Sequence, residues 1–108
     1  MPDKEAVRQW WAPWLVEKEK FDSVGEVMEA DYCFACGTGD VPTERAHIRA
    51  RVEGGSDSKT NIHLLCHECH IESEMIKGYK YYKWFVRQNV FGMALNSYMR
   101  RKLKSDSN

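Results

Sequence analysis

The chain has 108 residues and a formal net charge of zero, with 43% hydrophobic and 30% charged side chains. This length suits a single domain with a modest core, to which a structural metal would add stability. The composition is that of an ordinary soluble protein, and no apolar run approaches the roughly 20 residues that cross a bilayer, which excludes a membrane-spanning protein. Residues 1–5 are too polar for a signal peptide, so we expect a cytoplasmic, reducing compartment and no membrane partner.

Charge is unevenly distributed along the chain. Fifteen of the 16 acidic side chains lie in residues 1–74, whereas residues 75–104 hold eight basic side chains and no acid. The same segment is rich in aromatic side chains, namely Tyr79, Tyr81, Tyr82, Trp84, Phe85, Phe91 and Tyr98. Such a segment can neutralise phosphates locally. The alternative is a packed helix pair whose aromatic side chains form core and whose lysines are solvated.

Residues 1–30 are predicted to form two helices. Pro2 followed by acidic residues is typical of a helix start. Pro13 is expected to break or kink the first helix, and Ser23 with Glu26 forms a capping-box pattern that opens the second. Apolar side chains recur at helical spacing, and the tryptophans among them are expected in the core: Val7, Trp10, Trp11, Trp14 and Leu15.

Two Cys-x-x-Cys pairs follow, Cys33 with Cys36 and Cys66 with Cys69. Two intervening residues let both sulfurs of a pair reach one ion at about 2.3 Å, so four thiolates suit a closed tetrahedral Zn²⁺ site. A reducing compartment favours zinc over the alternative of two disulfides.

The remaining elements are read from local pattern. Paired glycines and small polar residues predict a loop over 53–60, and a short apolar run predicts a buried strand over 62–65. We also expect a strand over 41–48, a helix from 66 that ends near Gly78, helices over about 79–90 and 93–103, and a polar tail over 104–108.

At this point the ordered motifs resemble one family. They are Cys33-x-x-Cys36, Ala46-His47-Ile48, Gly54-Gly55, Asn61-Ile62-His63-Leu64-Leu65-Cys66 and Cys69-His70. This set resembles the HNH endonuclease family over about residues 33–74. The resemblance implies an α+β chain with a zinc-stapled ββα-metal core at 31–76. N-terminal helices at 1–30 and basic, aromatic C-terminal helices at 77–108 flank this core within one domain, 1–108.

The resemblance also implies roles for three residues. His47 is expected to be the general base, because imidazole has an ordinary pKa of about 6.5 and can take a proton from water near neutral pH. Asn61 is expected to fix the loop that holds this histidine. His70 is expected to bind a catalytic Mg²⁺ or Mn²⁺, which stabilises the phosphorane and the leaving oxygen and yields 5′-phosphate and 3′-hydroxyl ends.

One position departs from the family pattern. Many members have an Asp or His metal ligand directly before the base, where this chain has Ala46. Glu74, one helical turn after His70, is the expected replacement. Glu44 is a weaker candidate, because its side chain is expected on the strand face opposite His47. His63 is expected to be a surface residue or to contact a metal ligand, and not to bind the metal itself.

Basic residues near the site are candidates for DNA phosphates. The alternative for the arginines is that they are surface residues paired with Glu44 and Glu53. The expected DNA-binding residues are Arg49, Arg51, Lys80, Lys83 and Arg87.

Together these features predict a metal-dependent HNH endonuclease that hydrolyses DNA. The alternative is a non-catalytic zinc module that binds nucleic acid or protein. A chain this small is expected to need a homodimer or a protein partner to span both strands, so nicking is the expected activity of one copy.

Overall fold

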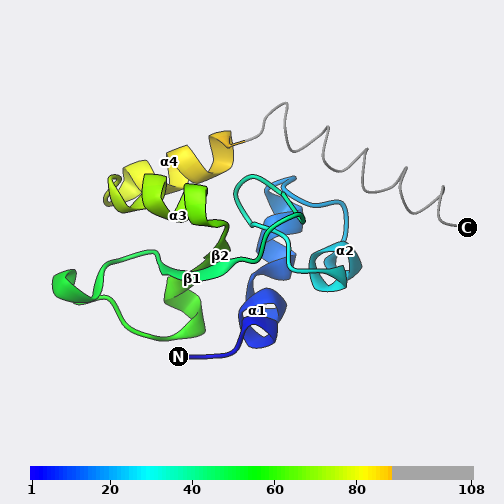
Figure 1. Ribbon diagram of the computed structural model, residues 1–108, viewed down its shortest axis with the longest axis horizontal. Coiled ribbons are helices and arrows are strands. Elements are labelled where there is room, and N and C mark those ends of the chain that lie inside the picture. Colours follow the sequence, from blue (N-terminus) through cyan, green and yellow to red (C-terminus); the bar gives the residue numbers. More distant parts are fainter. Residues whose placement is uncertain (89–108) are drawn as a thin grey trace, which may run out of the picture.

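A computed structural model describes residues 1–88 (Figure 1). Its elements are α1 (Lys4–Glu17), α2 (Val24–Glu29), β1 (Glu44–His47), β2 (Ile62–Leu65), α3 (His67–Glu74) and α4 (Tyr79–Arg87), with the 3₁₀ turns η1 (Arg51–Glu53) and η2 (Lys59–Asn61) between the strands. The α+β class predicted from the sequence is confirmed. The expected helix over 93–103 and the tail over 104–108 lie outside the described residues.

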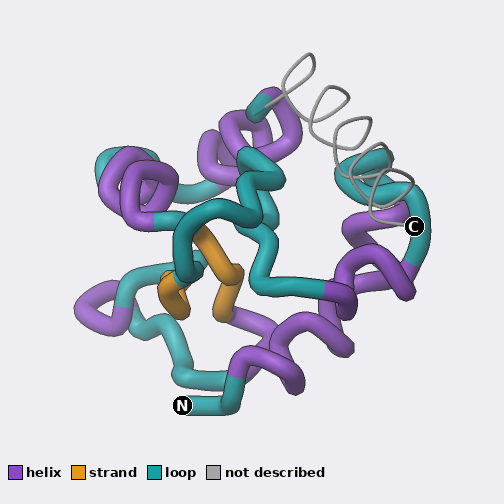
Figure 2. Tube along the Cα trace, turned by 45° about the vertical axis from the view of Figure 1, so that its right-hand side comes forward, coloured by secondary structure: helices purple, strands orange, loops and turns teal. Residues whose placement is uncertain are grey.

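The two strands form a short antiparallel sheet at the centre of the molecule. Its register pairs Glu44 with Leu65 and His47 with Ile62. In Figure 1 the strands lie between α3 and α4 on one side and α1 on the other. The loops and 3₁₀ turns that join the strands extend away from this centre, as the teal and purple connection between the orange strands in Figure 2 also shows.

Strand β1 begins later than the predicted 41–48, because the chain before it is bound to a side chain instead of to β2. The Thr43 amide donates to Asp31 Oδ2 at 2.9 Å, and Lys4 Nζ donates to the same oxygen at 3.0 Å. Arg8 of α1 also pairs with Asp31. Burial raises the pKa of Asp31, but the hydrogen bonds from Thr43, Lys4 and Arg8 outweigh it and hold that pKa well below its usual range.

His63 lies in the hydrophobic core and not at the surface. Its side chain is fully buried, and its Nδ1 lies 2.6 Å from the hydroxyl of Tyr81. The ring centroids of Trp11 and Phe85 lie 4.4 and 4.5 Å from that of His63. Helices from both ends of the described chain therefore pack on His63, and all four residues of β2 are buried.

Helix α1 is not broken at Pro13, and it differs from expectation at Trp10. It runs through Pro13 to Glu17 without a break. Pro13 and Gln9, whose carbonyl loses its helical partner, are both exposed, so water can satisfy that carbonyl. Trp10 is 50% exposed, with Lys59 Nζ 5.5 Å from its ring, whereas Trp11 is buried as predicted.

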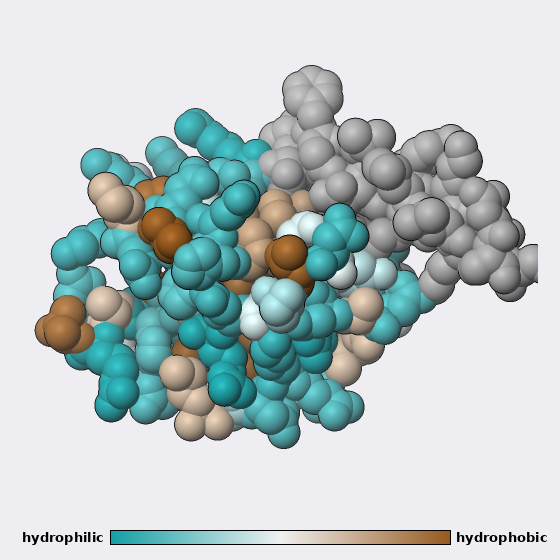
Figure 3. All heavy atoms as spheres, viewed as in Figure 1, coloured by the Kyte–Doolittle hydropathy of each residue, from teal (hydrophilic) through white to brown (hydrophobic). Residues whose placement is uncertain are grey.

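The capping box predicted for α2 is present. Ser23 Oγ accepts from the Glu26 amide at 3.1 Å, which satisfies one free N–H of the first turn. Within residues 1–88, none of the helices combines the length and the apolar character needed to cross a bilayer. The face drawn in Figure 3 is mainly hydrophilic, with apolar side chains in small separate groups.

Candidate active site and metal centre

The four cysteines converge on one point. Their sulfur atoms all lie within 4.8 Å of one another, and Cys36 Sγ is 3.7 Å from Cys66 Sγ. Four bonds of about 2.3 Å in tetrahedral directions place sulfurs about 3.8 Å apart, so the spacing fits Zn²⁺. All four are free thiols, so the two-disulfide alternative is not realised.

Each pair is shaped by its local backbone. In the first pair, the Gly37 amide donates to the Cys33 carbonyl at 2.9 Å, and Gly37 has a φ of 72°, which a residue with a side chain rarely adopts. In the second pair, Cys66 is the N-cap of α3 and Cys69 follows in its first turn. The cysteine cluster therefore joins the start of α3 to the turn before β1.

Electrostatics also favours a cation at this cluster. The sulfur of Cys33 raises the pKa of the Cys36 thiol to about 12, and Cys33 and Cys36 together raise the pKa of Cys69 well above its ordinary value. Four thiolates at this spacing repel one another, and a divalent cation at their centre removes the repulsion. The donor set and the spacing both fit zinc.

A buried lysine lies beside the cysteine cluster. Lys20 is 3% exposed, and its Nζ donates to the carbonyls of Ala35, Phe85 and Gln88 at 3.0, 2.8 and 2.8 Å. Burial lowers the pKa of Lys20 to about 8, and the neighbouring cysteine sulfurs act in the opposite direction. Lys20 thus joins the first cysteine pair to the last turn of α4.

The predicted catalytic residues meet at a pocket of about 750 Å³ on another part of the surface. This pocket is bounded by the end of β1, the chain that follows it, α3 and the turn between α3 and α4. The predicted site residues that line it are His47, Arg49, Arg51, Asn61, His70 and Glu74. Residues far apart in the sequence are thereby brought to one cavity.

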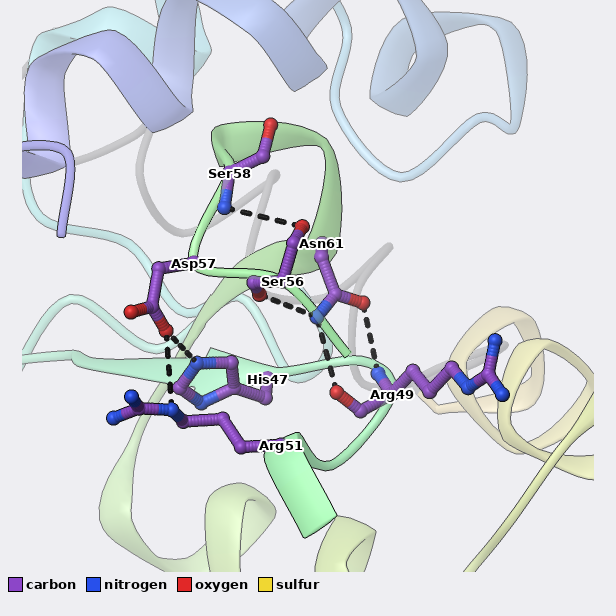
Figure 4. A network of polar contacts seen from close by, with 7 residues as sticks. All are labelled: His47, Arg49, Arg51, Ser56, Asp57, Ser58 and Asn61. Carbon is purple, nitrogen blue, oxygen red and sulfur yellow. Dashed lines mark hydrogen bonds and ion pairs between the residues drawn. The ribbon is translucent and has the colours of Figure 1, made fainter. Parts of the chain in front are cut away.

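Asn61 binds two stretches of the loop between the strands (Figure 4). Its Oδ1 accepts from the Arg49 amide at 2.9 Å, and its Nδ2 donates to the carbonyls of Arg49 and Ser56 at 3.0 and 2.8 Å. Gly55 allows these stretches to approach, because a Cβ at this position would lie 1.8 Å from the Arg49 carbonyl oxygen. The backbone just after His47 is therefore fixed to the backbone just before β2.

His70 is flanked by two carboxylates. Its Nδ1 lies 2.7 Å from Glu44 Oε1, and its Nε2 lies 3.4 Å from Glu74 Oε1. Hydrogen bonds from His70 and then from His67 lower the pKa of Glu44. Strand alternation suggested that Glu44 points away from the site, but its side chain reaches α3. Glu74 lines the pocket and Glu44 does not.

One contact of His47 was not expected from the sequence. Asp57 Oδ1 lies 2.8 Å from His47 Nε2 and 3.7 Å from Arg51 Nε. The His47 hydrogen bond, and to a smaller extent Arg51, lower the pKa of Asp57 despite the opposing effect of burial. Asp57 follows a Gly-Gly-Ser turn, and nothing in this sequence pattern distinguishes it from an ordinary loop acid.

The predicted basic residues fall into two sets. Arg49 and Arg51 line the same pocket as His47. The alternative was that these arginines pair with glutamates, but Arg51 contacts Asp57. The second set lies on one face of α4 and comprises Lys80, Lys83 and Arg87. Helix α4 contains no acidic residue.

Comparison with known proteins agrees with this geometry. Residues 32–74 match the family model described as HNH endonuclease, which covers both cysteine pairs, both strands and α3. Neither the curated proteins nor the solved structures gave a significant match. The match confirms the resemblance predicted for about residues 33–74. Residues 32–74 of this chain therefore form a segment similar to the HNH endonuclease family.

Proposed function

We propose that this protein is a metal-dependent endonuclease that hydrolyses phosphodiester bonds of DNA. One observation carries the proposal: a single pocket is lined by His47, Asn61, His70 and Glu74, which come from β1, η2 and α3. The HNH family match supports the reaction class. The pocket supplies the side-chain types that hydrolysis of a phosphodiester requires, namely a base, a positioning amide and oxygen and nitrogen ligands for a cation.

His47 acts as the general base in this proposal. Its side chain is 18% exposed at the edge of the pocket, so it can reach a water molecule while most of the ring is held by the protein. Asn61 restrains the backbone that follows His47 through its three hydrogen bonds. A fixed imidazole avoids the entropic cost of orienting the base in each turnover.

His70 and Glu74 hold the catalytic Mg²⁺ or Mn²⁺. Glu44 occupies Nδ1 of His70, which leaves Nε2 facing Glu74, and a ligating histidine commonly gives its other ring nitrogen to a carboxylate in this way. We therefore assign Glu44 to orienting His70 and Glu74 to coordination, in place of the ligand absent at Ala46. The bound ion supplies charge stabilisation at the phosphate oxygens and at the leaving 3′ oxygen.

Arg49 and Arg51 bind phosphates that flank the scissile bond, because they line the same pocket as the base. The exposed basic face of α4 extends the phosphate contact beyond the pocket. One pocket serves one strand, so one copy nicks DNA, and cleavage of both strands requires a second copy or a protein partner. Products carry 5′-phosphate and 3′-hydroxyl ends.

A non-catalytic zinc module is the second candidate. Among residues 1–88, the four cysteines form the one group of three or more metal-ligand side chains close enough to hold an ion. Two protein ligands are nevertheless sufficient for Mg²⁺, which keeps several of its waters and takes further oxygens from substrate phosphates. The enzyme therefore remains the better account of the pocket.

Cleavage of supercoiled plasmid tests the proposal. Zinc-loaded protein is incubated with EDTA, Mg²⁺, Mn²⁺ or added Zn²⁺. His47→Ala is assayed beside it, with Gln9→Ala as a control that removes an exposed polar side chain outside the pocket. The enzyme is supported if nicking needs Mg²⁺ or Mn²⁺, is lost in His47→Ala and persists in Gln9→Ala. If folded, zinc-loaded wild type binds DNA and leaves every phosphodiester intact, the protein is the binding module.

A further inference from the structure

The contact between Asp57 and His47 involves one particular nitrogen of the imidazole ring. The carboxylate comes from the loop between the strands and meets the ring from the side of Nε2, at 2.8 Å (Figure 4). An imidazole ring has two nitrogens, and in its neutral form one carries hydrogen while the other has a free electron pair. A carboxylate can only accept, so the contact places the hydrogen on Nε2 and leaves the electron pair on Nδ1.

Both sides of this contact are anchored by the same residue. Asn61 donates to the Ser56 carbonyl, directly before Asp57, and to the Arg49 carbonyl, two residues after His47. The amide of Ser58, the residue directly after Asp57, donates to Ser56 Oγ at 3.3 Å. The hydrogen-bonded loop backbone therefore holds the Asp57 carboxylate next to the His47 ring.

We propose that Asp57 is a positioning residue for the reaction: it fixes His47 in the tautomer whose Nδ1 accepts the proton of the attacking water. The inference rests on the proposed endonuclease function and deepens it, because it states which nitrogen is the base and what holds it. The same carboxylate then balances the positive charge of the imidazolium that forms. Its neighbour Arg51, 3.7 Å from the same oxygen, helps to keep Asp57 ionised.

Protons and electron pairs balance in this step. An O–H bond of water breaks, and its proton goes to Nδ1 of His47 while the oxygen forms a bond to phosphorus. The bond from phosphorus to the 3′ oxygen breaks, and that oxygen keeps the electron pair and takes a proton from solvent. His47 returns its Nδ1 proton to solvent, and Asp57 remains a carboxylate throughout.

Replacement of Asp57 tests the inference. Asp57→Ala removes a side chain that is 44% exposed, so the fold and zinc content are expected to persist, and Asp57→Asn provides a second variant of equal size. We expect both variants to lower kcat for nicking by roughly 10-fold to 100-fold while KM changes little, since partners of this kind act through the base and not through substrate binding. Asp40→Ala, which removes an exposed acid outside the pocket, is the matched control and is expected to behave as wild type.

A spectroscopic measurement separates this role from a structural one. In ¹⁵N-labelled, zinc-loaded wild type without Mg²⁺, we expect His47 to carry its proton on Nε2, as a slowly exchanging resonance that Asp57→Ala loses. Three results discriminate. If wild type cuts, His47→Ala does not and Asp57→Ala equals wild type, the inference fails and the proposed function stands. If the proton lies on Nδ1, the inference fails whatever the rates. If wild type does not cut, the proposed function fails and this inference with it.

Discussion

The substitution Asn61→Asp tests whether one amide holds the pocket loop together. The side chain keeps its size, and its Oδ1 can still accept from the Arg49 amide. The atom that replaces Nδ2, however, is an oxygen that faces the carbonyl oxygens of Arg49 and Ser56, at distances of 3.0 and 2.8 Å in the wild type. Two hydrogen bonds become two contacts between acceptors.

The expected loss in free energy of unfolding follows from the number of Asn61 hydrogen bonds that each substitution removes. A net hydrogen bond contributes about 1 kcal/mol, so Asn61→Ala, which loses all three, is expected to lower the free energy of unfolding by about 2 to 3 kcal/mol. Asn61→Asp loses two bonds and adds repulsion between a carboxylate and two carbonyls. We therefore expect it to cost at least as much as alanine, about 3 kcal/mol, although aspartate is the closer match in shape.

Urea unfolding of the zinc-loaded proteins at neutral pH measures these differences, and hydrogen exchange at the Arg49 amide reports the loop directly. Thr60→Ala is the control, since it removes only the 3.0 Å contact with Ser58 Oγ beside the network. Exchange at Arg49 should accelerate in Asn61→Ala and stay slow in Thr60→Ala. The proposed role of the amide is refuted if Asn61→Asp is as stable as wild type, or clearly more stable than Asn61→Ala.

Three further predictions concern other parts of the chain. Desolvation lowers the pKa of the fully buried His63 to about 3, whereas in the unfolded chain this side chain binds a proton below about pH 6.5. The free energy of unfolding should therefore fall by up to about 1.4 kcal/mol per pH unit as the pH drops from 6.5 toward 5. Urea titrations should show a shallower pH dependence for His63→Phe, and an equal dependence would contradict the burial argument. Glu44→Gln should weaken Mn²⁺ binding by roughly 10-fold and leave zinc content unchanged, whereas Glu74→Gln should weaken it more; calorimetric titration that ranks them in reverse would exchange their roles. Lys20→Met leaves three carbonyls without their donor and should lower the free energy of unfolding by about 3 kcal/mol or more, against an expected change within about 0.5 kcal/mol for the exposed Lys18→Met.

Much of the metal centre could be predicted, because its signals are local in the sequence. Two residues between cysteines determine how two sulfurs chelate one ion, so spacing alone was enough to group Cys33, Cys36, Cys66 and Cys69. The capping pattern at Ser23 likewise depends on a side chain and an amide three residues apart. Such features require no knowledge of which distant elements meet.

The contacts that could not be predicted depend on tertiary approach. Strand alternation assigns His63 to one face of β2, but all four residues of this strand are buried, so alternation alone cannot show that this polar ring is buried. Asp57 meets His47 only because Asn61 folds the intervening loop, and Glu44 reaches His70 because α3 packs against β1. Each of these residues has an ordinary local sequence environment.

The proposed active site depends on two separate structural ties. His47 and Asp57 are held by strand pairing and by Asn61, none of which involves a cysteine. His70, in contrast, directly follows Cys69 on α3, and the start of this helix is held by the cysteine cluster. We expect removal of zinc to release α3 before it releases the loop, since the loop keeps its hydrogen bonds. Binding of the catalytic ion should therefore be more sensitive to zinc chelation than the contact between His47 and Asp57. We predict that chelation of zinc lowers activity through His70 and not through the base.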